Sequence, residues 1–179
     1  MQIKQDIQAA IHRAIDEVHS TIDPVSDERF FGPLDQGKWS VAETLQHLFL
    51  VIRGLNKVLP GPREVFTQWG QAERPSKSFD EIQKAYLAVS TTPRKAPDQV
   101  APRAADLEAD RQTITDRFTM AHQALAANLE GWSEEELDTY QIPHLVLGKM
   151  TVREILFFTI LHLYHHLKPT QERLSKVVS

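Results

Sequence analysis

Residues 151–169 read TVREILFFTILHLYHHLKP, and this stretch decides the fold. Thr151 and Glu154 have the spacing of a capping box, in which each side chain accepts a hydrogen bond from a backbone amide at a helix start. Apolar residues then occupy nearly every side of the helix, so we expect residues 60–102 or a second subunit to cover its outer face. Proline removes a helical hydrogen bond, so Lys168-Pro169 predicts a kink or an end.

Three further windows without proline have apolar residues at three- and four-residue steps, which is typical of amphipathic helices. Proline inside a helix costs roughly 3 kcal/mol, so these windows are where long helices are expected. The predicted helices cover about 2–22, 40–59 and 104–130. Ser40-x-x-Glu43 and Ser133-x-x-Glu136 are further capping boxes, the second opening a short helix. The fold class expected is all-α, an antiparallel four-helix bundle with a long irregular connection between helices two and three.

The irregular connection, residues 60–102, holds six of the ten prolines of the chain. It is too long for a bare loop in a compact domain, so we expect one or two short helices in it. Ser78-x-x-Glu81 is a capping box that would begin one of them. No segment shows the sustained alternation of a β-strand. A length of 179 residues suits one domain, spanning 1–179.

Composition excludes several classes of protein. The formal net charge of −4 argues against nucleic acid as a partner, because phosphate binding needs a basic excess. The longest apolar stretch, Ile155–Leu167, has thirteen residues, and a membrane span needs roughly 20. The N-terminus carries charges throughout and does not read as a signal peptide, so we expect a cytoplasmic protein. Cysteine is absent, which excludes disulfides, thiolate metal sites and cysteine nucleophiles.

Three of the eight histidines fall within five positions of the fourth long helix. His162 and His166 are four residues apart and therefore share one face, a spacing that lets two imidazoles bind one metal ion. His165 could compete, but helical projection places it further outward. His47, at the edge of the apolar stripe of the second helix, is the expected third ligand. Three histidines with one open position are typical of a catalytic metal site, and imidazole suits zinc, nickel or iron.

Simpler interpretations stand beside this one. His47 alone would more often be a packed core histidine, and only its placement with His162 and His166 favours a metal. We expect Glu43 to close its capping box rather than to support the site, and Trp39 to anchor the core rather than to stack on a substrate. His144 follows Pro143 in a turn, where a solvent-facing position is expected in preference to one that lines the pocket. His12, His19 and His122 have no partners at useful spacing and are expected to be solvated.

Two groups of residues resemble the motifs of the DinB-like (YfiT-like) superfamily of metal-dependent enzymes. The first is Lys38-Trp39-Ser40-x-x-Glu43-x-x-x-His47-Leu48. The second is His144-x-x-x-Gly148-Lys149-x-Thr151-x-x-Glu154, followed by His162-x-x-His165-His166. The resemblance implies a four-helix bundle, often a homodimer, with a divalent metal held by three histidines that map onto His47, His162 and His166. Many relatives have Gly-Gln or Arg-Gln where this chain has Lys168-Pro169, a departure just after the last ligand.

The leading hypothesis is a metal-dependent enzyme that acts on a small molecule. In one chemistry the metal lowers the pKa of water for hydrolysis, and in the other it deprotonates a thiol cosubstrate for transfer or isomerisation. The resemblance implies both, because some relatives are thiol-dependent S-transferases or isomerases. The alternatives are a non-catalytic metal- or ligand-binding helical module and a metal-free bundle whose histidines are merely packed. Residues 60–102 are the expected source of substrate selectivity, because irregular segments carry variable contacts.

Overall fold

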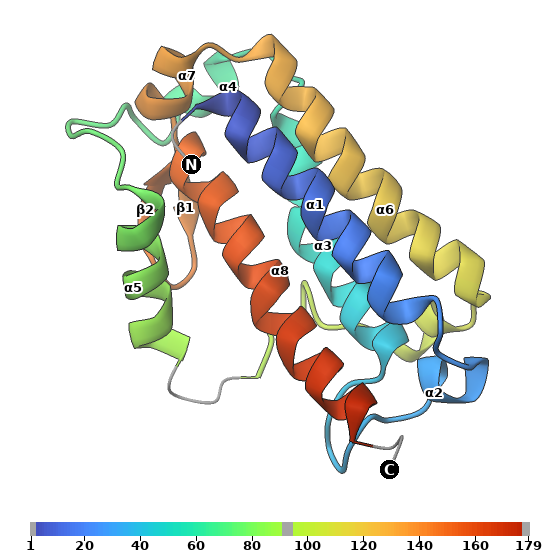
Figure 1. Cartoon of the computed structure of the whole chain (residues 1–179). Helices are drawn as coiled ribbons and strands as arrows, with labels where there is room; N and C mark the ends of the chain where they lie inside the picture. Colours follow the sequence, from blue (N-terminus) through green and yellow to red (C-terminus); the bar gives the residue numbers. More distant parts are fainter. Residues whose placement is uncertain (1–2, 91–94, 177–179) are drawn as a thin grey trace.

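The computed structural model describes residues 3–90 and 95–176 and is mostly helical, as predicted. Four long helices pack side by side (Figure 1): α1 (Lys4–Ile22), α3 (Val41–Val58), α6 (Arg111–Asn128) and α8 (Val152–Ser175). The shorter elements are α2 (Asp27–Phe31), α4 (Glu64–Thr67), α5 (Phe79–Ser90), α7 (Glu134–Thr139), two 3-10 turns (Ala104–Leu107 and Leu129–Gly131), and a hairpin of β1 (Gln141–His144) and β2 (Gly148–Thr151). No helix in the described part of the chain is both long and apolar enough to cross a bilayer.

Contacts at the helix ends give the direction of each long helix. The Lys4 ammonium, at the start of α1, donates to the carbonyl of Trp132 beyond the end of α6, so α1 and α6 are antiparallel. The indole N–H of Trp132 donates to the carbonyl of Leu59 at the end of α3, so α3 and α6 run the same way. The long connection after α3 makes this parallel pair possible, because it returns the chain to the opposite end of the bundle (Figure 1).

The other neighbours of α8 complete the arrangement. The Tyr164 hydroxyl donates to Glu17 at 2.8 Å and the Gln171 amide to Thr21 at 2.9 Å, so α1 and α8 run in parallel. Helices α3 and α8 are antiparallel (Figure 1). The expected antiparallel packing therefore holds for two of these four neighbouring pairs, and the other two pairs are parallel.

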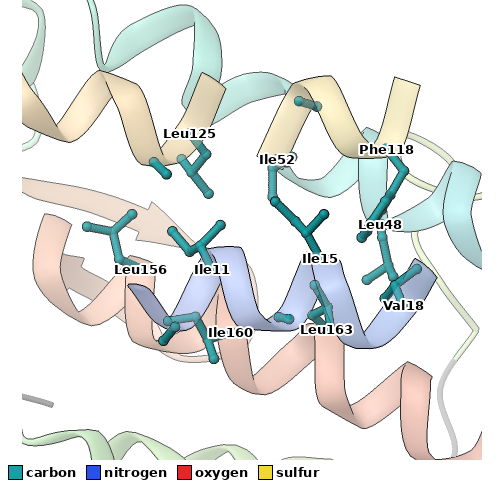
Figure 2. Packing of buried hydrophobic residues seen from close by; sticks show 14 of the residues in the cluster. Ile11, Ile15, Val18, Leu48, Ile52, Phe118, Leu125, Leu156, Ile160 and Leu163 are labelled. Carbon is teal, nitrogen blue, oxygen red and sulfur yellow. The ribbon is translucent and has the colours of Figure 1, made fainter. Parts of the chain in front are cut away.

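One hydrophobic core joins the four long helices, and Figure 2 shows its central layers. Ile11, Ile15 and Val18 of α1 recur at the spacing that the sequence predicted and point between the neighbouring helices. Full burial of each such side chain stabilises the fold by roughly 1.5–3 kcal/mol. Around them lie residues of the other three helices, namely Leu48, Ile52, Phe118, Leu125, Leu156, Ile160 and Leu163.

The outer face of α8 is covered from within the chain. Helix α5 lies in the 60–102 segment and begins after the predicted Ser78–Glu81 box, in which the Ser78 amide donates to the Glu81 carboxylate. The rings of Phe79 and Phe157 meet edge to face at 5.6 Å. The prediction that residues 60–102 cover this helix is confirmed, so its apolarity no longer requires a second subunit. A homodimer stays a prediction for light scattering to test.

Three boundaries differ from those expected. Helix α6 begins at Arg111 rather than near Ala104, because the Asp110 carboxylate accepts the Thr113 amide and caps a new helix there. Helix α8 continues through Pro169 to Ser175, so of the two predicted alternatives at Lys168-Pro169, a kink or an end, the end is wrong. Buried Leu174 anchors this last part to the bundle, and the Arg29 guanidinium donates to its carbonyl. The expected helix start at residue 2 lies outside the described residues.

The hairpin was not predicted. Its strands have four residues each, and Pro143 interrupts the first, so alternation over this length carries no recognisable signal. Gly148 adopts a φ of 73°, which favours glycine and lets β2 turn back along β1. The hairpin leads directly into Thr151, the residue that caps α8.

One expected surface histidine is in the core. His122 is 1% exposed and its Nδ1 donates to the Phe118 carbonyl one turn earlier, so the expectation that it is solvated is wrong. It lies four residues after Phe118 and three before Leu125, within the apolar stripe itself. His19 is half-buried, with its Nε2 at 2.9 Å from the Thr119 hydroxyl, whereas His12 is exposed as expected.

We expect His122 to make the protein sensitive to mild acid. Burial lowers the pKa of His122 to about 4. The unfolded chain therefore takes up a proton at this residue near pH 6.5, and stability falls as pH drops from there to about 4, by on the order of 3 kcal/mol. His122→Leu should reduce the pH dependence of the unfolding free energy in this window, as measured by urea denaturation. His12→Gln, at an exposed position, should leave it unchanged, and equal pH dependence in both variants would contradict the assignment.

Candidate metal centre

Three imidazoles from two helices meet at one point. His162 Nε2 lies 3.4 Å from His47 Nε2 and 3.2 Å from His166 Nε2. One ring nitrogen from each of the three residues lies within 4.8 Å of the others, which is a separation that a single metal ion could bridge. The structure thus brings together all three sequence-predicted residues, although α3 and α8 are far apart in the chain.

The tautomer of His47 is fixed by a backbone carbonyl. Its Nδ1 lies 2.8 Å from the Val100 carbonyl oxygen, which can only accept, so Nδ1 carries the proton. Nε2 of His47 therefore presents a lone pair to His162. Metal-binding histidines commonly donate their second ring N–H to a carbonyl in this way, which orients the ligand. Val100 belongs to the irregular connection, and no feature of the sequence marked its carbonyl.

The nitrogen spacing fits a metal ion. Nitrogens about 2.1 Å from a tetrahedral zinc ion would lie about 3.4 Å apart. The two short Nε2–Nε2 distances around His162 are close to this value. In the absence of a cation, His162 Nε2 can carry one hydrogen atom, and this hydrogen can form a good hydrogen bond to only one of the two nearby nitrogens, His47 Nε2 or His166 Nε2. The donor set is entirely imidazole, which suits zinc, nickel and ferrous iron.

All three rings are held in the neutral form that a metal requires. Burial lowers the pKa of His47, and burial together with the neighbouring imidazoles lowers the pKa of His162 well below its usual value. Burial, together with the neighbouring imidazoles of His47 and His165, lowers the pKa of His166 to about 3. Neutral imidazoles can bind a cation near pH 7 without first releasing protons.

The three histidines line a cavity of about 1090 Å³. Its wall comes from α3, α5, the connection before α6, the β1–β2 hairpin and α8. Trp39 forms part of this wall, with its ring stacked on His166 at a centroid distance of 5.8 Å and tilted against His47 at 4.8 Å. Trp39 is not in the main core cluster, so the expectation that it anchors the core is wrong. Its position just before the capping residue Ser40 brings its ring against His47 and His166 instead.

Two further histidines line the same cavity. His144 was expected to face solvent in a turn, but it is part-buried, with its ring 4.3 Å from that of Phe158. Its Nδ1 accepts the backbone amides of Val146 and Leu147, so the proton of the neutral ring is on Nε2. Burial lowers the pKa of His144 and of His165. His165 is exposed, lies edge-on to Tyr86 at 5.4 Å and stands apart from the three-histidine group, as the helical projection predicted.

Glu43 takes the role that the sequence favoured. Its carboxylate accepts the Ser40 amide at 2.7 Å, while the Ser40 hydroxyl accepts the Glu43 amide. Both halves of the predicted capping box are therefore present at the start of α3. Glu43 does not line the cavity among the residues described there.

Comparisons with known proteins agree with this architecture. YfiT from Bacillus subtilis, described as "a probable metal-dependent hydrolase with an unusual four-helix bundle topology", shares the fold with a TM-score of 0.63. The two chains are 16% identical, and the match covers 97% of this chain and 87% of YfiT. No curated protein matches the sequence. The family model of the DinB superfamily matches residues 10–168, nearly the whole sequence, and the chain therefore belongs to the DinB superfamily.

Proposed function

We propose that His47, His162 and His166 bind a divalent metal ion and that the chain is a metal-dependent enzyme for a small molecule held in the adjacent cavity. The observation that carries this proposal is the convergence of three neutral Nε2 atoms beside a large cavity. Zinc, nickel and iron all fit the donor set. We further propose that residues 1–179 form one domain, since one cluster of buried side chains draws on all four long helices.

Hydrolysis is the first candidate reaction, as the description of YfiT also suggests. When bound, the metal would supply a Lewis acid that lowers the pKa of water or of a thiol. The residues of the chain would position the substrate. His144 lines the same cavity as His162, and its Nε2–H would donate a hydrogen bond to a substrate oxygen that gains negative charge.

Thiol transfer is the second candidate, and one observation favours it. No aspartate or glutamate appears among the described residues that line the cavity, so a carboxylate base for activating water is not at hand. A thiol deprotonates far more readily than water and needs no such base. The exposed imidazole of His165 is the group best placed to accept a proton in either reaction.

The first experiment is to measure metal content. Protein purified without a polyhistidine tag should contain about one equivalent of a divalent metal by mass spectrometry, consistent with one three-ligand site. The loaded protein should then be assayed against ester, amide and thiol-transfer substrates. Turnover that is lost on chelation and restored by the metal supports an enzyme. Metal binding without turnover in all three assays would instead favour a non-catalytic binding module, and absence of metal would contradict the site.

A further inference from the structure

The cavity wall has an unusual distribution of charge. Lys38, Lys95 and Arg173 contribute to it, whereas no carboxylate does among the described lining residues. The whole chain has 24 acidic against 20 basic side chains, so composition alone would put acidic groups there as well. Like charges gathered in a cleft with apolar walls create a field that attracts ions of opposite sign.

Arg173 is placed in line with the proposed metal ligands. It follows His166 by seven residues on the same helix, which is two turns or roughly 10 Å along the axis. Arg173 lines the same cavity as the three histidines, and long helical side chains commonly lean back toward the N-terminus of the helix, which favours a guanidinium that faces the site. Pro169 and Thr170, which lie between His166 and Arg173 in the sequence, also line the cavity.

These cations are available to a ligand. None of the ion pairs found in residues 3–90 and 95–176 engages Lys38, Lys95 or Arg173. Arg173 is also half-buried, and its planar fork of N–H donors matches the two oxygens of a carboxylate. Lys38 directly precedes Trp39, the residue that stacks on His166, and lines the same cavity.

We propose that the molecule bound in this cavity is anionic, with a carboxylate or similar group held by Arg173, Lys38 and Lys95 and its reactive end at the three histidines. This inference rests on the proposed function, since the metal site defines the reactive end. A substrate of this class has two separated polar ends joined by an apolar segment, which suits a cavity whose lining is mostly apolar.

Two hydroxamates that differ only in a terminal carboxylate test the proposal. Adipic acid monohydroxamate and hexanohydroxamate have the same chain length and the same metal-binding group. Isothermal titration calorimetry on the zinc-loaded protein should give about tenfold tighter binding for the carboxylate compound, as expected for a charge-assisted hydrogen bond. Arg173→Gln should remove this preference and leave hexanohydroxamate binding unchanged, and Arg173→Lys should restore part of it. Arg13→Gln, an exposed arginine on α1, is the matched control and should change neither affinity.

A second arm separates this inference from the metal site. Metal-stripped protein should bind hexanoate more tightly than hexanol, with a preference that weakens in high salt and in Arg173→Gln. Equal affinities for the charged and uncharged members in both arms would overturn the anionic assignment. If the preference for hexanoate persists but neither hydroxamate responds to zinc, the anion subsite stands and the proposed metal function fails.

Discussion

Replacing His162 with alanine is expected to abolish stoichiometric metal binding while the helical fold is retained. His162 Nε2 is the central atom of the group, within 3.4 Å of both other Nε2 atoms. Its loss leaves only two of the three proposed ligands, His47 and His166. Loss of an outer-shell partner alone costs 10–100-fold in metal affinity, so loss of this ligand should cost at least about 100-fold. Zinc and nickel affinities measured by calorimetry, with metal content by mass spectrometry, check the prediction.

The same helix offers a matched control. His165→Ala removes an imidazole three residues away that lines the cavity but lies outside the three-histidine group. It should keep full metal content, and circular dichroism should show equal helicity in both variants. His47→Ala and His166→Ala should behave like His162→Ala. Wild-type metal content in His162→Ala, or equal loss in His165→Ala, would mean that the ion is held elsewhere.

The second large effect is expected at Glu154, in the first turn of α8. Its carboxylate is fully buried and receives both terminal nitrogens of Arg74, at 2.5 and 2.9 Å. The backbone amides of Lys77 and Thr151 also donate to it. Glutamine keeps one of the two carboxylate oxygens and replaces the other with an NH2 group, so two of these donors lose their acceptor and Glu154→Gln should lower the free energy of unfolding by about 3 kcal/mol.

Glu43→Gln provides the comparison, because Glu43 holds the same capping-box position on α3 without an arginine partner. It should cost only about 1 kcal/mol, the value of a helix cap. Urea denaturation of the two variants at pH 7 measures the difference. Costs that agree within error would show that the Arg74 pair contributes nothing beyond the cap.

The pair also predicts a pH dependence. Burial by itself would raise the pKa of Glu154, but the Arg74 guanidinium and the two amides outweigh it and hold the pKa below its ordinary value. The stabilisation is therefore complete above the unfolded pKa near 4.3 and is lost as pH falls through the lower folded value. The unfolding free energy of Glu154→Gln, measured by urea denaturation as pH is lowered, should therefore fall less steeply than that of the wild type in this acid range.

Sequence reasoning succeeded where the determinants are local. The capping boxes at Ser40, Ser133 and Thr151 involve residues three positions apart, and each begins a helix at the expected place. Helical periodicity likewise put His162 and His166 on one face, and the two lie together with His47 in the structure, while their role as metal ligands stays a prediction. These features depend on spacing within one turn and require no knowledge of the neighbouring elements.

Prediction from the sequence failed where contacts between segments far apart in the chain determine the structure. Helix α8 passes Pro169 because tertiary packing holds the residues beyond it, and proline propensity contains no such information. Trp39 and His144 lie at the cavity because α3 and the hairpin converge on α8 in space. The Val100 carbonyl that orients His47 belongs to the backbone of an irregular segment, where residue identity gives no signal.

The separation of the three histidines along the chain has a consequence for biosynthesis. His47 lies on α3, whereas His162 and His166 lie on α8, the last of the described helices. A nascent polypeptide still lacking α8 could offer an incoming ion only one of the three imidazoles. Loading of the proposed site would therefore follow translation of α8, and translation products that lack this helix would bind such an ion only weakly.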